Sequence, residues 1–168
     1  MIVELPTRAD THALGRVLAS VLQAGDLVLL TGPLGAGKTV LAQGIGAGLG
    51  VPGPVVSPTF VIARVHRGGR LPLVHVDAYR LGSVAEVDDL DLDADLADSA
   101  LVVEWGGGLA EQLAEAHLAV HLDRPRTGER RTAVLVPSGG TWPQRAAAAL
   151  AAWTPAAPAP ERGRVSSA

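Results

Sequence analysis

The sequence predicts an α/β fold, a three-layer sandwich in which flanking helices cover a mostly parallel central sheet with some antiparallel strands. One observation is the apolar run 26–31 (DLVLLT), which is typical of a strand buried in a parallel sheet. Another is the glycine-rich stretch 32–39 (GPLGAGKT), which fits G-x-x-x-x-G-K-T and leads into a helical pattern over 38–49. A strand, such a loop and a helix in succession are typical of folds built around a phosphate-binding P-loop.

The N-terminal residues are expected to form a strand and a helix. Residues 2–5 form a short edge strand in this prediction, because a proline closes it. Thr7 followed by Asp10 resembles a helix start, with an acid in place of the usual Glu or Gln. Apolar residues then recur at helical spacing over 14–22, and Gly25 ends the run.

Hairpin and capping signals organise the middle of the chain. Strands are predicted at 59–66 and 71–78, because the turn-forming residues 67–70 (RGGR) separate them. Ser83 with Glu86 makes a capping box for a short helix.

The C-terminal third is predicted to begin with a buried strand at 100–104. A short helix at 109–116 follows, then an antiparallel pair of strands at 118–122 and 131–136. A terminal helix is expected over 141–153. Residues 1–153 would therefore form the P-loop domain, and the Ala-, Pro- and Ser-rich residues 154–168 a disordered tail.

Composition excludes several classes of protein. The 168 residues fit one domain, and a net charge of −3 argues against a large basic surface for direct nucleic-acid binding. The absence of cysteine excludes disulfides, zinc–thiolate sites and thiol catalysis. The first residues do not form a signal peptide, and no apolar stretch reaches membrane-spanning length, so a cytoplasmic protein without a membrane partner is expected.

Lys38 is the only lysine of the chain, whereas all other cationic side chains are arginines. A compact ammonium fits between phosphate oxygens inside a closed loop, where the planar fork of arginine is too wide. Backbone N–H groups over 35–38 and the positive end of the following helix would face the phosphates, and Thr39 would place its hydroxyl on Mg²⁺. The loop therefore predicts a P-loop NTPase fold that binds a nucleoside triphosphate.

Asp77 and Glu104 each end an apolar strand. Ligands gather at the carboxyl ends of strands in open α/β sheets, so both acids should face the phosphate loop. We expect one to hold Mg²⁺, directly or through water, and the other to orient or deprotonate the attacking water. The alternative is that both are solvated or cap a helix.

The acidic stretch 88–96 does not predict a calcium site. An EF-hand loop that begins at Asp91 would need glycine at its sixth position and glutamate at its twelfth, where this chain has Leu96 and Val102. We interpret the stretch as a solvated segment with buried leucines.

Three further motifs carry a family resemblance: 57–60 (SPTF), 75–81 (HVDAYRL) and 103–105 (VEW). With the loop, their order and spacing resemble the TsaE family (formerly YjeE), small bacterial P-loop ATPases of tRNA threonylcarbamoyladenosine synthesis. The resemblance spans residues 14–136.

The resemblance implies an accessory subunit that binds and hydrolyses ATP with Mg²⁺ and works with TsaB and TsaD in a heteromeric complex. In that scheme TsaD transfers a threonylcarbamoyl group to adenosine 37 in tRNAs reading ANN codons. The nucleotide cycle of the TsaE-like subunit lets the TsaB–TsaD pair turn over, so tRNA is involved only indirectly.

By motif match, the resemblance also implies site residues. The nucleotide would be bound by Gly35, Ala36, Gly37, Lys38, Thr39, Val40, Thr59 and Trp105. The catalytic residues would be Lys38, Asp77 and Glu104, and the metal-side residues Thr39, Asp77 and Glu104. Ser57 and Thr59 would belong to a switch-like loop that senses the γ-phosphate, while Tyr79 and Arg80 would serve the site or the partner surface.

Two positions depart from the family pattern. Pro33 stands where the loop of the family usually has aspartate, and Gly107 stands where an acid usually follows the Glu-Trp pair. Neither change removes a phosphate or metal ligand named above. Both put in doubt any role of those acids in tuning hydrolysis.

Other nucleotide-dependent functions stay open. A small-molecule or nucleotide kinase is the main alternative, with the arginines over 124–131 as a phosphate-clamping lid, although a solvated hairpin loop is the preferred interpretation of that cluster. A GTPase that reads guanine through an NKxD element is excluded, because the chain has no asparagine. A module that binds nucleotide without turnover is the remaining alternative.

Overall fold

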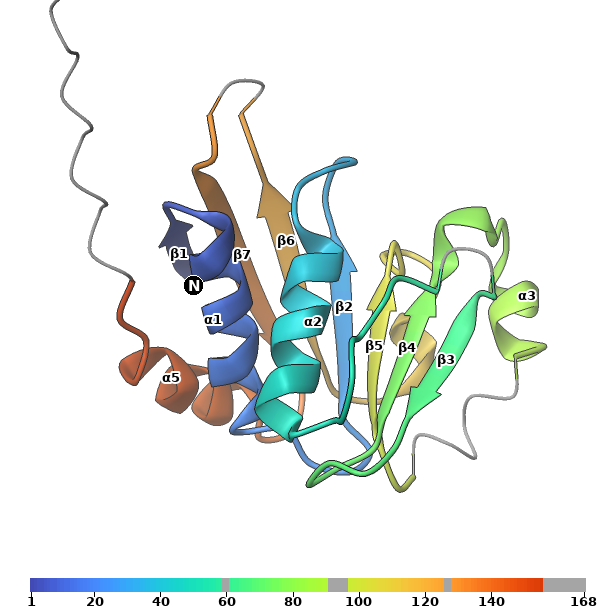
Figure 1. Cartoon of the computed structure of the whole chain (residues 1–168). Helices are drawn as coiled ribbons and strands as arrows, with labels where there is room; N and C mark the ends of the chain where they lie inside the picture. Colours follow the sequence, from blue (N-terminus) through green and yellow to red (C-terminus); the bar gives the residue numbers. More distant parts are fainter. Residues whose placement is uncertain (59–60, 91–96, 126–127, 156–168) are drawn as a thin grey trace, which may run out of the picture.

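The computed structural model describes residues 1–58, 61–90, 97–125 and 128–155. Within them the strands form a seven-stranded sheet in the order β1-β7-β6-β2-β5-β4-β3 (Figure 1). The inner strands β6, β2, β5 and β4 run parallel, while β7, β1 and β3 join through antiparallel pairings. The strands are β1 (Ile2–Leu5), β2 (Leu27–Thr31), β3 (Ala63–His66), β4 (Leu73–Asp77), β5 (Ala100–Glu104), β6 (His117–Asp123) and β7 (Arg131–Ser138).

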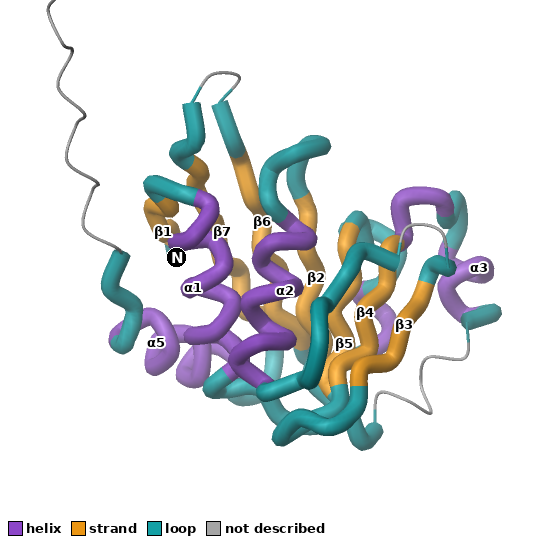
Figure 2. Tube along the Cα trace, in the orientation of Figure 1, coloured by secondary structure: helices purple, strands orange, loops and turns teal. Residues whose placement is uncertain are grey.

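Helices lie on both faces of this sheet, which confirms the predicted α/β sandwich. The α-helices are α1 (Arg8–Ala19), α2 (Lys38–Leu49), α3 (Val84–Asp88) and α5 (Trp142–Ala151), and the 3₁₀ turns are η1 (Ala78–Arg80) and η2 (Glu111–Leu113). Figure 2 shows α1, α2 and α5 together on one face. On the other face, Val87 of α3 and Ala110 before η2 pack against the strands.

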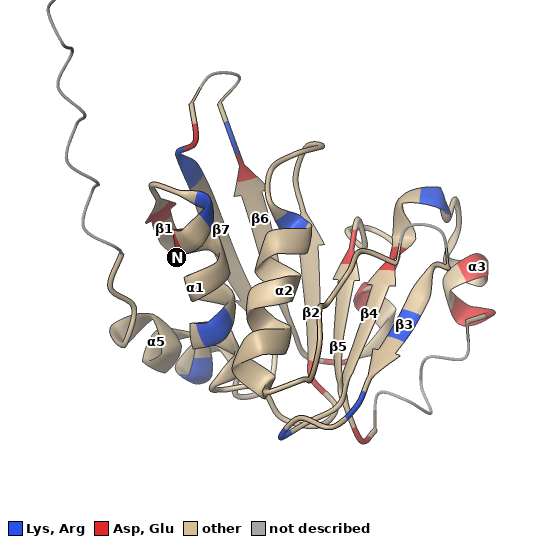
Figure 3. Cartoon of the chain, viewed as in Figure 1, with Lys and Arg blue, Asp and Glu red and all other residues tan. Residues whose placement is uncertain are grey.

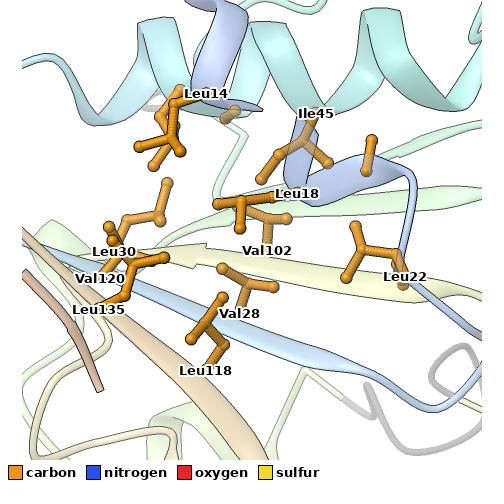
Figure 4. Packing of buried hydrophobic residues seen from close by; sticks show 14 of the residues in the cluster. Leu14, Leu18, Leu22, Val28, Leu30, Ile45, Val102, Leu118, Val120 and Leu135 are labelled. Carbon is orange, nitrogen blue, oxygen red and sulfur yellow. The ribbon is translucent and has the colours of Figure 1, made fainter. Parts of the chain in front are cut away.

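The larger core lies between the sheet and the helices α1, α2 and α5. Alternation along β2 divides its side chains, because Val28 and Leu30 enter this core while Leu27 and Leu29 enter the opposite one. Figure 4 shows leucines of α1 meeting valines and leucines of β2, β5, β6 and β7 in the larger core. The inner strands are therefore buried on both faces, as parallel strands require.

The predicted cap starts α1 where expected, but the helix is shorter than its apolar pattern. The N–H of Thr7 donates to Asp10 at 2.9 Å and the N–H of Asp10 donates to the Thr7 hydroxyl at 3.2 Å, which makes the capping box. The helix ends at Ala19, whereas Val21 and Leu22 continue in a tighter turn with bonds to residues three earlier. The apolar spacing extends past the helix because this turn also faces the core.

The strand predicted at 59–66 is wrong at residues 61 and 62, which precede β3. Residues 59–60 lie outside the described part, and β3 begins only at Ala63. The N–H groups of Val61 and Ile62 both donate to the carbonyl of Pro58, at 2.9 and 2.7 Å, and Ile62 has a φ of 67°. Val61 and Ile62 therefore lie in a turn rather than in the strand.

The helix predicted at 109–116 is only the 3₁₀ turn η2. Ala114 is already extended, with φ −151° and ψ 143°, and β6 follows at His117. The helical part of the connection therefore ends at Leu113, and the chain from Ala114 onward leads into β6.

Two glycines bring α1 and α2 into backbone contact. A Cβ atom at Gly15 would lie against the carbonyl oxygen of Leu41, and one at Gly44 against the carbonyl oxygen of His12. Only glycine permits this approach, and it fixes how the start of α2 sits relative to the start of α1.

A bidentate ion pair ties α5 to the sheet. Both terminal nitrogens of Arg145 contact the carboxylate of Asp26, at 2.6 and 2.7 Å, and Arg145 also donates to the carbonyl of Val21. Asp26 is predicted inside the strand, but β2 begins one residue later, at Leu27, and the Asp26 side chain accepts from the N–H of Gln23.

Several predicted features fall on residues that the structure does not describe. Thr59 of the switch-like loop, residues 91–96 of the acidic stretch, and residues 156–168 of the expected tail lie outside the described residues. Among the residues that are described, no helix is long and apolar enough to cross a membrane.

Candidate nucleotide site

A cavity of about 490 Å³ lies at the carboxyl ends of β2, β4 and β5, where the phosphate loop meets them. Its lining residues are Arg8, Leu34, Gly35, Gly37, Lys38, Thr39, Val40, Ser57, Asp77, Tyr79, Glu104, Trp105 and Arg131. Figure 3 shows acidic residues at the upper ends of β4 and β5, and basic residues at the starts of α2 and β7. The predicted phosphate-binding and acidic residues thus line one cavity, which contains both cationic and anionic side chains.

The loop between β2 and α2 takes the form that its glycines permit. Gly32 has a φ of 126°, and a Cβ there would collide with the carbonyl oxygen of Leu122 on β6. Gly37 caps α2 with a φ of 112°, in the left-handed region where most side chains are strained. The loop can therefore press against the sheet and direct the first N–H groups of α2 toward the cavity.

Ala36 differs from its neighbours in the loop. Its side chain is fully buried in the core, it does not line the cavity, and its N–H donates to the carbonyl of Pro33 at 3.2 Å. Gly35, Gly37 and Val40, by contrast, border the cavity. The expected contact from Ala36 to a nucleotide stays a prediction.

The ammonium of Lys38 is turned onto its own loop. Nζ donates to the carbonyls of Gly32 and Pro33, at 2.8 and 3.0 Å, and lies 3.5 Å from the centroid of the Trp105 ring. Burial lowers the pKa of Lys38 below its usual 10.5, while the carboxylates of Glu104 and Asp77 partly offset this. Two carbonyls and an aromatic face thus hold the cation next to the space that phosphates would take.

Asp77 and Glu104 are paired in register on β4 and β5, so both carboxylates leave the sheet at one point. The side chain of Asp77 is 6% exposed and accepts from the N–H of Tyr79 at 3.0 Å and from the hydroxyl of Ser57 at 3.4 Å. Glu104 is 3% exposed, and its Oε2 accepts from the hydroxyl of Thr39 at 3.0 Å. The predicted metal-side residues are therefore brought together.

The oxygen-bearing side chains of Thr39, Asp77 and Glu104 fit a magnesium ion. Mg²⁺ prefers oxygen ligands and in nucleotide sites uses one or two carboxylates together with substrate phosphates and water. Over residues 1–58, 61–90, 97–125 and 128–155, no group of three or more His, Cys, Asp or Glu forms a complete metal site. The donor set of Thr39, Asp77 and Glu104 thus suits a metal that phosphates help to hold.

Sequence reasoning gave His75 no role beyond its place in a motif. His75 is fully buried in β4, and its Nε2 lies 2.9 Å from Oε1 of Glu104. The available signal was one polar residue inside the apolar run LPLVHVD, but that pattern alone does not distinguish a partnered histidine from an ordinary core histidine.

The interpretation of the arginines over 124–131 as a solvated hairpin loop is wrong for Arg131. Arg124 and Arg130 are exposed, as expected of a solvated hairpin loop, but Arg131 is 7% exposed and lines the cavity together with Arg8. Burial lowers the pKa of Arg131, and neighbouring Arg124 adds to this. Its Nε has no hydrogen-bond partner among the described residues and lies close to Gly37, which leaves a donor beside the start of α2.

Trp105 and Tyr79 form the aromatic side of the cavity. Their ring centroids are 5.0 Å apart with an interplanar angle of 58°. Trp105 has a φ of 63°, unusual for a residue with a side chain, and its N–H donates to the carbonyl of Leu30 at 2.8 Å. Arg80 is exposed and does not line the cavity.

Comparison with known proteins gives consistent results. A family model described as "Threonylcarbamoyl adenosine biosynthesis protein TsaE" matches residues 5–132. A relative from Streptomyces coelicolor, named tRNA threonylcarbamoyladenosine biosynthesis protein TsaE, is 62% identical over 114 residues, which are 66% of this chain and 77% of the relative. A relative of the same name from Mycobacterium leprae is 54% identical over 133 residues, 74% of this chain and 83% of the relative.

A solved structure agrees with the fold. The crystal structure of Bacillus subtilis YdiB matches with a TM-score of 0.71 and 26% sequence identity, over 89% of this chain and 93% of that chain. The match extends across most of both molecules.

Proposed function

The chain belongs to the TsaE family, and on that premise we propose that it is a Mg²⁺-dependent ATPase that acts as an accessory subunit in tRNA modification. The names of its relatives support a role in tRNA threonylcarbamoyladenosine biosynthesis. The proposed step is the threonylcarbamoyl modification of adenosine 37 in tRNAs reading ANN codons, together with TsaB and TsaD. Residues 1–153 would form the ATPase domain.

One observation carries the ATPase part of this proposal. The hydroxyl of Thr39, which follows Lys38 at the start of α2, donates to Glu104 on β5, whose register partner is Asp77. The phosphate loop and the two strand-end carboxylates therefore converge on one cavity. A module that binds nucleotide without turnover would need carboxylates only to hold Mg²⁺, so we assign the second of the two buried carboxylates to hydrolysis.

Lys38 would exchange one set of oxygens for another when ATP binds. Its Nζ now donates to two loop carbonyls, and the β- and γ-phosphates would replace them as acceptors with full negative charge. The first N–H groups of α2 would donate to the same phosphates, and Arg131 would add a second cation from β7. Binding and orientation of the triphosphate thus fall to the loop and to Arg131.

Thr39 and Asp77 would hold Mg²⁺ on one side of the γ-phosphate, with Glu104 directly or through water. The ion would supply charge neutralisation of the phosphate oxygens. Glu104 would accept a proton from the attacking water, because its carboxylate is buried at the rim of the cavity and already accepts one hydrogen bond from the side of the loop. Thr59 and Ser57 would belong to the loop that senses the γ-phosphate.

Exposed apolar groups at the mouth of the cavity support a protein partner. Leu34 at the tip of the phosphate loop is 91% exposed and Tyr79 is 64% exposed, and both border the cavity. A partner that covers them would touch the loop and would sense its nucleotide state. We propose that this partner is the TsaB–TsaD pair, that tRNA is contacted only through it, and that the protein acts in the cytoplasm, where bacterial tRNA is found.

The first experiment measures nucleotide binding and turnover by the full chain. Equilibrium dialysis with ATP and Mg²⁺ should show uptake that Lys38→Ala abolishes, and release of phosphate should follow, alone or with TsaB and TsaD present. No uptake under either condition would reject the proposal. ADP formation that depends strongly on an added small acceptor would instead identify a kinase.

The second experiment tests the pathway. A reaction that contains TsaB, TsaD, the threonylcarbamoyl adenylate and substrate tRNA should form the modified nucleoside over repeated turnovers only when this chain and ATP are included. If omission of the chain leaves the multiple-turnover yield unchanged, the chain is not needed for the modification, whatever its ATPase activity.

A further inference from the structure

His75 is a buried polar residue of β4 that the proposed mechanism does not use. All five residues of β4 are buried, and His75 has no exposed surface. A buried imidazole in an apolar strand is unfavourable unless its nitrogens find partners. The partner therefore indicates what this histidine does.

The partner is the carboxylate of Glu104 on the neighbouring strand. Val102 is the register partner of His75 on β5, so Glu104, two residues further on, is the diagonal neighbour on the same face. His75 Nε2 lies 2.9 Å from Oε1 of Glu104. A carboxylate only accepts hydrogen bonds, so Nε2 carries the proton and donates.

Glu104 is consequently held from two directions. Oε1 accepts from His75 inside the sheet, whereas Oε2 accepts from Thr39 at the cavity. His75 does not line the cavity, so it can act on a bound nucleotide only through Glu104. The Nδ1 atom of His75 has no partner within the described residues, which leaves Glu104 as the partner found for this ring.

We propose that His75 is a positioning residue for Glu104: its Nε2–H fixes one carboxylate oxygen so that the other faces Thr39 and the attacking water. The inference rests on the proposed function, in which Glu104 activates that water. Loss of the donor would let the carboxylate rotate away from the water position, while the loop would still bind the triphosphate. Turnover should therefore fall without a matching loss of affinity.

The test compares three variants of the full chain with ATP, Mg²⁺ and the proposed partners present. His75→Leu removes the donor, His75→Gln restores an amide donor of similar reach, and Leu73→Val is a matched control on the same strand and face. We expect His75→Leu to lower kcat about 10–100-fold, a range typical of residues that orient an active-site ligand. KM should stay within about threefold, His75→Gln should recover most of the rate, and Leu73→Val should turn over like the parent.

A double-mutant cycle separates positioning from general damage. In a Glu104→Gln background, His75→Leu should cause no further loss of turnover, because the group that it orients no longer acts as a base. A loss as large as in the parent would overturn the inference, as would parent-like kcat in His75→Leu. If His75→Leu does not fold by circular dichroism, His75→Asn, whose amide is too short to reach Glu104, takes its place. Equal rates for Asn and Gln would then overturn the inference.

The outcome also distinguishes this inference from the proposal on which it rests. Full turnover by Glu104→Gln would remove Glu104 from the chemistry and with it the proposed mechanism. An inactive Glu104→Gln beside an active, folded His75→Leu would overturn only the role of His75.

Discussion

Replacement of Glu104 by glutamine should preserve the site and slow hydrolysis. Glutamine has nearly the same shape, so its amide oxygen can accept from His75 as Oε1 now does at 2.9 Å. Its amide N–H₂ can donate to the hydroxyl of Thr39, which now donates to Oε2 at 3.0 Å but can also accept. The exchange weakens charge-assisted hydrogen bonds by about 1 kcal/mol, so Tm should fall by about 2–4 °C.

The effect on turnover should be much larger than the effect on stability. A positioned general base contributes about 10²–10⁴-fold to a rate, so Glu104→Gln should lower single-turnover ATP hydrolysis at least about tenfold, which is about 1.4 kcal/mol of transition-state stabilisation. ATP affinity should be unchanged or higher, because one negative charge next to the phosphates is lost. Glu115→Gln, an exposed carboxylate away from the cavity lining, is the matched control.

The magnesium dependence decides which role Glu104 has. If its carboxylate mainly holds Mg²⁺, excess Mg²⁺ should restore turnover of Glu104→Gln, whereas a lost base is not restored by metal. A folded Glu104→Gln protein that hydrolyses ATP at the parent rate would refute the reasoning for both roles.

The other predictions concern affinity and stability. Arg131→Ala should weaken ATP binding about tenfold by loss of a charge-assisted contact, measured by calorimetry, while Arg130→Ala, whose side chain is 70% exposed, should bind like the parent. Arg145→Ala should lower the free energy of unfolding by about 3 kcal/mol, because Asp26 at 9% exposure is left without its ion-pair partner. Urea unfolding measures this loss, and a loss below about 1 kcal/mol, the value of an exposed pair, would contradict it. Gly44→Ala should lower the free energy of unfolding by about 1–3 kcal/mol, because the added methyl group would collide with α1. The better helix propensity of alanine offsets part of this loss. An unchanged unfolding midpoint would contradict the close contact.

Features encoded by neighbouring residues could be predicted from the sequence. The bounds of α2 and β5 match their expected ranges, because the glycines that flank α2 and the apolar run of β5 act locally. The convergence of Lys38, Asp77 and Glu104 also followed from local signals, since the carboxyl ends of parallel strands must share one edge.

Features that depend on distant residues could not be predicted. The start of β3 at Ala63 depends on its pairing with Val76 of β4, which the residues around Pro58 do not specify. Arg131 is buried because β7 pairs with β1 beside the start of α2, a relation that the local charge pattern of the hairpin loop does not carry. The bond from His75 to Glu104 needs the register of two strands, which neither apolar run specifies alone.

The backbone contact between α1 and α2 makes the nucleotide site sensitive to changes far from it. Gly15 and Gly44 lie within the two helices, yet α1 begins at Arg8 and α2 at Lys38, and both of those residues border the cavity. A side chain wedged between the helices would tilt one against the other and carry both cations out of alignment. A genetic screen for inactive alleles should therefore return substitutions at positions 15 and 44 as well as in the phosphate loop. A map of such alleles would mark the contact between α1 and α2.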